Sequence, residues 1–175
     1  MIKSERIIME PFDMKYLQDY FLGFDADITR YQWPDPFDTI EDARNVLQGF
    51  LDEMSKGETL FFSILSEDGR FLGSVEVHGL TGDCPELGIW LRASEQHTGY
   101  AYEALRAVLD FVCTEYGRTE FFYEADIRNE ASTRLLRRFG SDCRITDLEP
   151  EELTTDSGKR LNLQGHIVTK TETGA

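Results

Sequence analysis

The sequence predicts an α/β domain of the α+β kind, with a mixed but mostly antiparallel central sheet of about six to seven strands flanked by helices. Three observations support this prediction. Strand-like runs of β-branched and aromatic residues alternate with amphipathic runs at helical spacing along the chain. Three of the strand-like runs follow one another and end at a glycine turn, Gln96 to Ala101. The helix that this turn opens leads to a further strand, and such a crossover requires a parallel strand pair.

The order of the elements follows from periodicity and from turn signals. Apolar residues at helical spacing indicate helices, whereas alternating or β-branched runs indicate strands. Gly57 and Gly117 follow helical runs and indicate helix ends, and Asp68-Gly69 is typical of a hairpin turn. The expected elements are the strand Glu5–Met9, the helices Phe12–Phe21 and Ile40–Lys56, the strands Leu60–Leu65, Phe71–His78 and Glu86–Leu91, the helix Tyr100–Tyr116, the strand Glu120–Asp126, a helix ending near Phe139, and a hairpin with strands near Cys143–Ile145 and Leu161–Val168.

Two of these helices begin with capping signals. Thr39 is the expected N-cap of the helix Ile40–Lys56, and Asp42 takes the place of a capping-box glutamate. Asn129 is the expected N-cap of the last helix, with Ser132 at its third position.

The remaining segments are expected to be irregular. They are the aromatic segment Phe24–Pro36, the loop Gly79–Pro85, the acidic stretch Glu149–Gly158 and a frayed tail over residues 169–175. The chain shows neither an internal repeat nor a domain boundary. Residues 1–175 are therefore expected to form a single domain.

Composition and charge exclude several classes of protein. Hydrophobic residues make up 41% of the chain and aromatic residues 12%, which suits a globular rather than a disordered protein. The net charge of −15 argues against binding to nucleic acid or to an anionic membrane surface, because both attract basic proteins. No apolar run is long enough to span a bilayer, and the first residues lack the apolar core of a signal peptide.

The cysteines predict neither a metal site nor a disulfide framework. Cys84, Cys113 and Cys143 are odd in number and do not have the spacing of zinc ligands. We therefore expect no metal, and a reducing cytoplasm is the expected location.

The turn Gln96–Ala101 has the chemistry of an anion-binding site. The first N–H groups of a helix lack intrahelical partners and lie at the positive end of the helix dipole. Gly99 allows a phosphate to approach the backbone closely, because it has no Cβ. A P-loop is excluded, since no Gly-Lys-Ser/Thr follows the turn. The residues expected to hold the phosphate groups are Gln96, His97, Thr98 with its hydroxyl, Gly99, Tyr100 and Ala101.

This Gln-x-x-Gly-x-Ala pattern resembles the pyrophosphate-binding turn of the GNAT N-acetyltransferase superfamily, whose members hold acetyl-coenzyme A. The pattern Asn129-x-x-Ser132, the closing Phe139-Gly140 and the order of elements over Glu5 to Val168 resemble the same superfamily. The resemblance implies a GNAT fold, whose sheet is splayed between the strand before the glycine turn and the next strand. It also implies that Asn129 and Ser132 contact the cofactor.

In that family the pantetheine arm pairs with the strand before the glycine turn, which is Glu86–Leu91 here. A bulge in this strand leaves N–H groups free for the cofactor and for the oxyanion. The resemblance therefore assigns these roles to the N–H groups near Trp90 and Leu91.

The segment Asp27 to Pro34 resembles the corresponding loop of the Rim-type ribosomal-protein N-acetyltransferases, a group that includes enzymes acting on other proteins and on small amines. Tyr31 and Trp33 would then line the acceptor pocket. The alternative is that both residues only pack the loop onto the core. The implied acceptor is the amine of a protein N-terminus or of a small molecule, and the oligomeric state stays open, with a homodimer as one alternative.

Acetyl transfer to an amine also requires a base that accepts the amine proton. Alternation along Glu86–Leu91 directs Glu86 away from the helices, so we expect Glu86 to be the base. Glu124 is the second candidate, because it matches the base position of a protein-acetylating branch of the family. The alternative for Glu124 is a strand residue that is either solvated or held in an ion pair, with Arg92 or Arg128 as the partner. The lesser candidates are His78 and Glu76, and Glu76 is also expected to contact the acceptor.

One position departs from the family pattern. Many members have a tyrosine seven residues after the asparagine, which donates a proton to the leaving thiolate, and this chain has Leu136 there. Either Ser132 or water protonates the thiolate, or no acid is required. The departure also leaves an alternative function open, a coenzyme A-binding or regulatory module without turnover.

Overall fold

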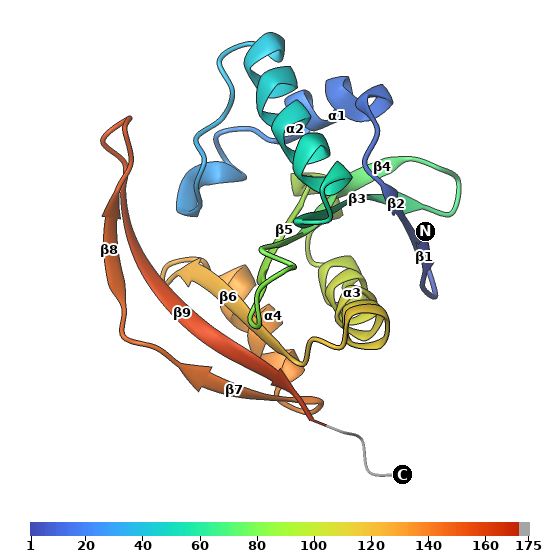
Figure 1. Cartoon of the computed structure of the whole chain (residues 1–175). Coiled ribbons are helices and arrows are strands. Elements are labelled where there is room, and N and C mark those ends of the chain that lie inside the picture. The colour runs from blue at the N-terminus through green and yellow to red at the C-terminus, as the bar shows by residue number, and fades with distance from the viewer. Residues whose placement is uncertain (172–175) are drawn as a thin grey trace.

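The computed structural model describes residues 1–171 and shows one open sheet with helices on both faces (Figure 1). The strands are β1 (Ile2–Lys3), β2 (Ile7–Pro11), β3 (Thr59–Ser66), β4 (Phe71–His78), β5 (Glu86–Leu91), β6 (Glu120–Asp126), β7 (Cys143–Asp147), β8 (Glu151–Thr154) and β9 (Arg160–Lys170). The helices are α1 (Leu17–Gly23), α2 (Ile40–Ser55), α3 (Tyr100–Tyr116) and α4 (Glu130–Phe139), and short 3₁₀ helices span Met14–Tyr16, Thr29–Tyr31 and Ala93–Glu95.

One strand pair breaks the antiparallel pattern of the sheet. The strand order is β1-β2-β3-β4-β5-β6-β9-β7, with β8 paired to β9, and among the described strands only β5 and β6 run parallel. Their pairing is confined to one position, Glu86 opposite Phe122, where the Phe122 N–H donates to the Pro85 carbonyl at 2.9 Å. The two strands diverge beyond this point, so the predicted splay is confirmed.

The sheet separates two hydrophobic clusters. α3 and α4 pack on one face, where Leu87 and Leu91 of β5 are buried. α1 and α2 cover the opposite face, where Trp90 is buried (Figure 1). The predicted alternation along β5 is therefore confirmed, because its successive side chains point to opposite faces of the sheet.

The central elements and both helix caps agree with the sequence prediction. β4, β5, α3 and β6 have the predicted bounds. Thr39 Oγ1 accepts from the Asp42 N–H at 3.2 Å, and Asp42 Oδ2 accepts from the Thr39 N–H at 3.0 Å. Asn129 Oδ1 accepts from the Ser132 N–H at 3.1 Å. These capping hydrogen bonds satisfy N–H groups that a helix start leaves unpaired.

The C-terminal hairpin differs from the prediction. β8 lies inside the acidic stretch that was expected to be irregular, and all four of its residues are exposed. Such a strand shows no apolar alternation, because it has no buried face, and its only partner is β9. β9 extends to Lys170, so the prediction of a frayed tail is wrong for residues 169 and 170. Residues 172–175 lie outside the described residues.

The N-terminal segment also differs in detail. Pro11 is the last residue of β2 instead of lying beyond it. The Phe12 N–H bonds to the Phe61 carbonyl at 2.8 Å, so the alternating ladder directs the Pro11 nitrogen away from β3, where no donor is needed. The expected helix over Phe12–Phe21 begins as a 3₁₀ helix, because Asp13 Oδ1 accepts from the Lys15 N–H at 2.7 Å, and α1 follows it.

None of the helices in residues 1–171 combines the length and the apolar character that crossing a bilayer requires.

Candidate functional site

Two cavities adjoin at the splay between β5 and β6. The first, which we call the turn cleft, has a volume of about 660 Å³ and is bordered by residues 27–32, the end of β5, the glycine turn and α4. The second, which we call the carboxylate pocket, has a volume of about 260 Å³ and is bordered by Glu76, Glu86 and Glu124. The residues that border both cavities are Tyr31, Gln32, Ile89, Trp90, Asn129 and Ser132.

The glycine turn presents an open helix start to the turn cleft. Gly99 is the N-cap of α3 and has a φ of 91°, a conformation that glycine adopts without strain. His97 also has a positive φ, 61°. Gln96, His97, Gly99 and Ala101 border the cleft, as predicted for a phosphate-binding turn.

Thr98 and Tyr100 do not border the cleft. The Thr98 hydroxyl donates to the Glu95 carbonyl at 2.7 Å and accepts from the Tyr100 N–H at 3.4 Å. The structure therefore uses this hydroxyl to shape the turn, whereas the sequence suggested a phosphate contact. The Tyr100 ring lies under the Arg6 guanidinium, with 4.8 Å between the guanidinium carbon and the ring centroid.

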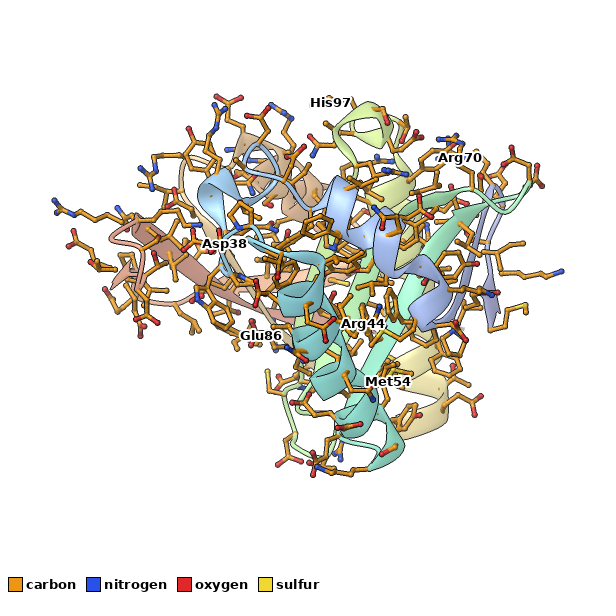
Figure 2. All side chains as sticks on the ribbon, turned by 90° about the horizontal axis from the view of Figure 1, so that it is seen from above. Asp38, Arg44, Met54, Arg70, Glu86 and His97 are labelled. Atoms are coloured by element: carbon orange, nitrogen blue, oxygen red, sulfur yellow. The ribbon has the colours of Figure 1, made fainter. Side chains whose placement is uncertain are left out.

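Two arginine–glutamate pairs hold the turn from either side. Before the turn, Arg70 of the β3–β4 hairpin bonds to the nearly buried Glu95. After the turn, Arg6 bonds to Glu103 in the first turn of α3, and Arg6 Nη1 donates to the Thr98 carbonyl at 3.1 Å. Figure 2 shows Arg70 and His97 at the same end of the molecule. Both sides of the turn are therefore connected to segments that are distant in the sequence.

Guanidinium groups surround the open side of this turn. A Cβ placed on Gly99 would lie 3.2 Å from Arg6 Nη2 and 3.9 Å from Arg138 Nη1. Arg134 and Arg138 of α4 border the turn cleft, and Arg138 forms no ion pair within residues 1–171. In a chain with a net charge of −15, such a local gathering of cations beside an open helix start suits a phosphorylated ligand.

Sequence reasoning missed these arginines. The spacing of Arg134 and Arg138, four residues apart on a predicted helix, was a usable signal, because residues at this spacing share one face. The contribution of Arg6 had no local signal, since it comes from the other end of the chain.

The ladder between β4 and β5 determines which N–H groups of β5 are directed into the splay. The Arg92 N–H donates to the Leu72 carbonyl, so Trp90 belongs to the bonded pair with Ser74, and Ile89 and Leu91 direct their N–H groups toward β6. The Leu91 N–H is therefore directed into the splay, which agrees with the prediction of a free N–H group there. The Trp90 N–H, in contrast, takes part in the pairing with β4. The expected bulge is also wrong for β5, whose register with β4 has no shift, whereas a shift lies between β3 and β4.

Asn129 and Ser132 lie where the two cavities meet. Asn129 caps α4 through its Oδ1 and at the same time borders both cavities, so the two predicted roles do not exclude each other. Burial raises the pKa of the Tyr123 phenol, and the nearby Ser132 side chain opposes the rise. Leu136 is buried in the core between α4 and the sheet.

Three glutamates border the carboxylate pocket, and they differ in their hydrogen-bond partners. Glu76 accepts from the Ser74 hydroxyl at 2.7 Å and lies 3.3 Å from His78 Nε2, and this contact raises the pKa of His78. Glu86 and Glu124 have no side-chain hydrogen bond or ion pair among the described residues. Burial raises the pKa of Glu124, and the carboxylates of Glu86 and Glu151 raise it further.

The alternative reading of Glu124 as an ion-pair partner is wrong. Arg92 pairs with Asp19, and Arg128 pairs with Asp126. Of the other predicted acceptor contacts, Tyr31 borders both cavities and Trp33 borders the carboxylate pocket while staying 68% exposed. The loop aromatics are therefore not confined to packing on the core.

Glu86 lies farther from the glycine turn than the other two carboxylates. It is opposite Phe122, where β5 and β6 are still paired, whereas Glu76 is opposite Gly88, two residues nearer to the splay. Figure 2 shows Glu86 well apart from His97. Within residues 1–171, no group of three His, Cys, Asp or Glu side chains is arranged to hold a metal ion.

A family model described as an acetyltransferase (GNAT) domain matches residues 6–142. No curated protein matches the sequence.

Several solved structures share the fold at low sequence identity. RimL, a ribosomal L7/L12 alpha-N-protein acetyltransferase in complex with coenzyme A, has a TM-score of 0.82 and 17% identity, over 95% of this chain and 96% of that chain. RimJ of Mycobacterium smegmatis in complex with CoA-disulfide has a TM-score of 0.79 and 20% identity, over 97% and 84%. Spermidine N-acetyltransferase from Vibrio cholerae in complex with coenzyme A and spermine has a TM-score of 0.75 and 14% identity, over 94% and 95%.

Proposed function

This chain belongs to the GNAT acetyltransferase family, and we propose that it transfers an acetyl group from acetyl-coenzyme A to a primary amine by direct attack. The observation that supports this most is the junction of the two cavities. A cleft with an open helix start and arginines adjoins a pocket bordered by carboxylates, at the place where β5 and β6 separate. This arrangement offers one side for a phosphorylated cofactor and the other for a cationic acceptor.

The residues of the turn cleft fit coenzyme A. We propose that Gln96, His97, Gly99 and Ala101 hold the pyrophosphate through the turn, and that Arg134 and Arg138 neutralise phosphate charge. Acetyl-coenzyme A would supply the thioester that is attacked. The N–H groups of Ile89 and Leu91 would hold the pantetheine arm and donate to the developing oxyanion, and Asn129 would contact the same arm.

Among the carboxylates, we propose Glu124 as the base that accepts the amine proton. Its raised pKa makes it a stronger base than an ordinary glutamate, and its carboxylate has no competing partner among the described residues. Glu86 has the same freedom but lies farther from the splay, so we propose that it raises the pKa of Glu124 and attracts the amine. Glu76 is engaged with Ser74 and His78, and contact with the acceptor is the role that we propose for it.

The leaving thiolate of coenzyme A needs a proton donor other than the tyrosine that many family members have at the position of Leu136. Leu136 has no hydroxyl, but Ser132 borders both cavities and lies next to the Tyr123 phenol. Because its pKa is raised, Tyr123 stays protonated at neutral pH, and its phenol lies near Ser132. We therefore propose Ser132 as the donor to the thiolate.

The acceptor that suits this pocket is a cationic amine. The similar structures include enzymes described as acting on a ribosomal protein N-terminus and on spermidine, and either kind of acceptor is a primary amine. The second candidate function is a coenzyme A-binding module without turnover, which the leucine at position 136 favours.

The test is thiol release from acetyl-coenzyme A with a panel of diamines, polyamines and N-terminal peptides, with the acetylated product identified by mass spectrometry. Thiol release that depends on the acceptor supports the transferase. Binding of acetyl-coenzyme A without release for any acceptor supports the non-catalytic module.

A further inference from the structure

A single lysine joins the C-terminal hairpin to the loop before α2. The ammonium of Lys159, in the turn between β8 and β9, donates to the carbonyl of Thr29 at 3.0 Å and to the carbonyl of Gln32 at 2.7 Å. It also lies 2.6 Å from Asp35 Oδ1. A lysine ammonium has three N–H donors, and each one has an acceptor here. The two carbonyls are 130 and 127 positions away in the sequence.

Both partners of this contact are ordered by their own hydrogen bonds. In the hairpin, the Thr155 N–H donates to the Lys159 carbonyl at 2.9 Å, and the Lys159 N–H donates to Thr155 Oγ1 at 3.1 Å. In the loop, Thr29 is buried and begins the 3₁₀ helix Thr29–Tyr31, and the Gln32 N–H donates to its carbonyl at 3.2 Å. The ammonium therefore bonds to the carbonyls of the first residue of this 3₁₀ helix and of its C-cap residue, Gln32.

The ion pair with Asp35 stays charged at neutral pH. The contact with Lys159 lowers the pKa of Asp35, and the nearby Ser157 of the same hairpin lowers it further. The side chains of Lys159 and Asp35 are only 20% and 33% exposed, so the contact is partly shielded from water.

The segments that Lys159 joins are walls of the carboxylate pocket. Tyr31, Gln32 and Trp33 border it from the loop, and Leu153 and Leu161 border it from β8 and β9. Figure 1 shows the tip of the β8–β9 hairpin beside the segment that precedes α2. The contact thus holds two walls of the pocket, the loop and the β8–β9 hairpin, in a fixed position relative to each other. The pocket volume of about 260 Å³ is below the range of roughly 300–1,000 Å³ that is typical of small-molecule sites.

We propose that Lys159 is a specificity-determining residue, which holds two walls of the carboxylate pocket together and restricts the acceptor to a slender cationic amine. The proposal rests on the proposed function, since it concerns the acceptor of that reaction. Lys159 acts through the loop that it holds and is therefore a positioning residue.

The first measurement is hydrogen exchange of the amides in residues 24–37, for the wild type and for Lys159→Met, which keeps the length of the side chain but removes its donors. Exchange in this segment should become faster in the variant. Lys56→Met is the matched control, because Lys56 is an exposed lysine at the end of α2 with no ion pair in the described part of the chain. Unchanged exchange in Lys159→Met would overturn the proposal.

The second measurement compares two diamines of equal charge and different girth, 1,4-diaminobutane and 1,4-bis(aminomethyl)benzene, by calorimetry in the presence of coenzyme A. We divide the dissociation constant of 1,4-diaminobutane, the slender diamine, by that of 1,4-bis(aminomethyl)benzene, the bulky one. This ratio should rise about tenfold in Lys159→Met, because the preference for the slender diamine is lost, and tenfold is the size expected for losing one charge-assisted contact. Lys159→Arg keeps the charge and the donors and should restore most of the preference. A ratio that stays at the wild-type value in Lys159→Met, even with faster exchange, contradicts the proposal. Selective binding without any acetyl transfer would instead refute the proposed function and leave this inference standing.

Discussion

Arg6 and Glu103 are 97 positions apart, yet the backbone N–H and the side-chain Nε of Arg6 donate to the two carboxylate oxygens of Glu103, at 2.7 and 2.8 Å. Glu103 is in the first turn of α3, and its side chain is only 12% exposed. Because Arg6 also donates to the Thr98 carbonyl, one side chain connects the N-terminal segment, the glycine turn and the helix start. The turn that we assign to the pyrophosphate therefore depends on residues outside its own motif.

The first prediction concerns this connection. Arg6→Gln removes the ion pair with Glu103 and the guanidinium group beside Gly99. The dissociation constant for coenzyme A should therefore rise about tenfold. Calorimetry with coenzyme A measures this. Arg44→Gln is the control, because Arg44 forms an exposed pair with Glu41 on α2, and such pairs contribute little. Equal affinity of both variants would refute the role of Arg6.

The second prediction concerns Gly99. Valine at this position requires a φ of 91°, which β-branched residues rarely adopt, and its Cβ would lie 3.2 Å from Arg6 Nη2. Gly99→Val should abolish coenzyme A binding in the assay used for the wild type. Gly117→Val is the matched control, because Gly117 ends the same helix with a φ of 67° and no neighbour within 4 Å of an added Cβ. If Gly117→Val also loses binding, strain in α3 rather than the turn explains the result.

The third prediction separates two arginines of one helix. Arg138 borders the turn cleft, whereas its neighbour Arg137 does not. Arg138→Gln should weaken coenzyme A binding and flatten its dependence on salt concentration, because one fewer cation meets phosphate charge. Arg137→Gln should do neither. Titrations at two salt concentrations measure both effects, and parallel behaviour of the two variants would contradict the assignment.

The fourth prediction separates the two roles of Asn129. Asn129→Ala removes the cap of α4 and should cost about 1 kcal/mol of unfolding free energy, whereas Asn129→Asp keeps a capping oxygen. If Asn129 also contacts the cofactor, both variants should bind coenzyme A more weakly, and only the alanine variant should lose stability. Denaturant unfolding and calorimetry together measure this. Normal affinity of Asn129→Asp would leave capping as its sole role.

The fold was predictable where the sequence pattern and the environment agree. β5 has one face toward α3 and the other toward α1 and α2, so Leu87, Trp90 and Leu91 determine its bounds and its orientation. β8 was not predictable, because all of its residues are exposed and its pairing with β9 leaves no apolar pattern.

The site was predictable as far as its motifs are local. The residues of the glycine turn lie within the stretch Gln96–Ala101, and Asn129 and Ser132 are three positions apart, so the spacing within each motif was enough to find it. Arg6, Arg70 and Lys159 act on segments that are distant in the sequence, and only the folded chain brings them there. The choice between Glu86 and Glu124 also depends on the pairing of β5 with β6, which spacing does not reveal.

The last prediction concerns the base. Glu124→Gln should lower kcat by roughly 10²–10⁴ without a change in affinity for coenzyme A, because the amine proton then lacks its acceptor. In the wild type, the rate should fall at low pH as Glu124 is protonated, and the raised pKa puts this fall above the usual range of a glutamate. Glu86→Gln removes one of the causes of the raised pKa, so the fall should move to lower pH. Glu152→Gln is the control, since Glu152 is an exposed carboxylate of β8 that does not contribute to this pKa.

The stability of the Glu124→Gln variant provides an independent check, because the substitution should lower the activity without lowering the melting temperature. A pKa that is raised in the folded state means that folding favours the protonated form, so the ionised Glu124 costs stability above its folded-state pKa. Glu124→Gln should therefore melt at a temperature equal to or higher than that of the wild type at neutral pH, and the difference should vanish at acidic pH, where Glu124 is neutral. A loss of activity together with a lower melting temperature would indicate a structural role. Full activity of Glu124→Gln at neutral pH, with the acid fall retained, would exclude Glu124 as the base and return the assignment to Glu86 or to the Glu76–His78 pair.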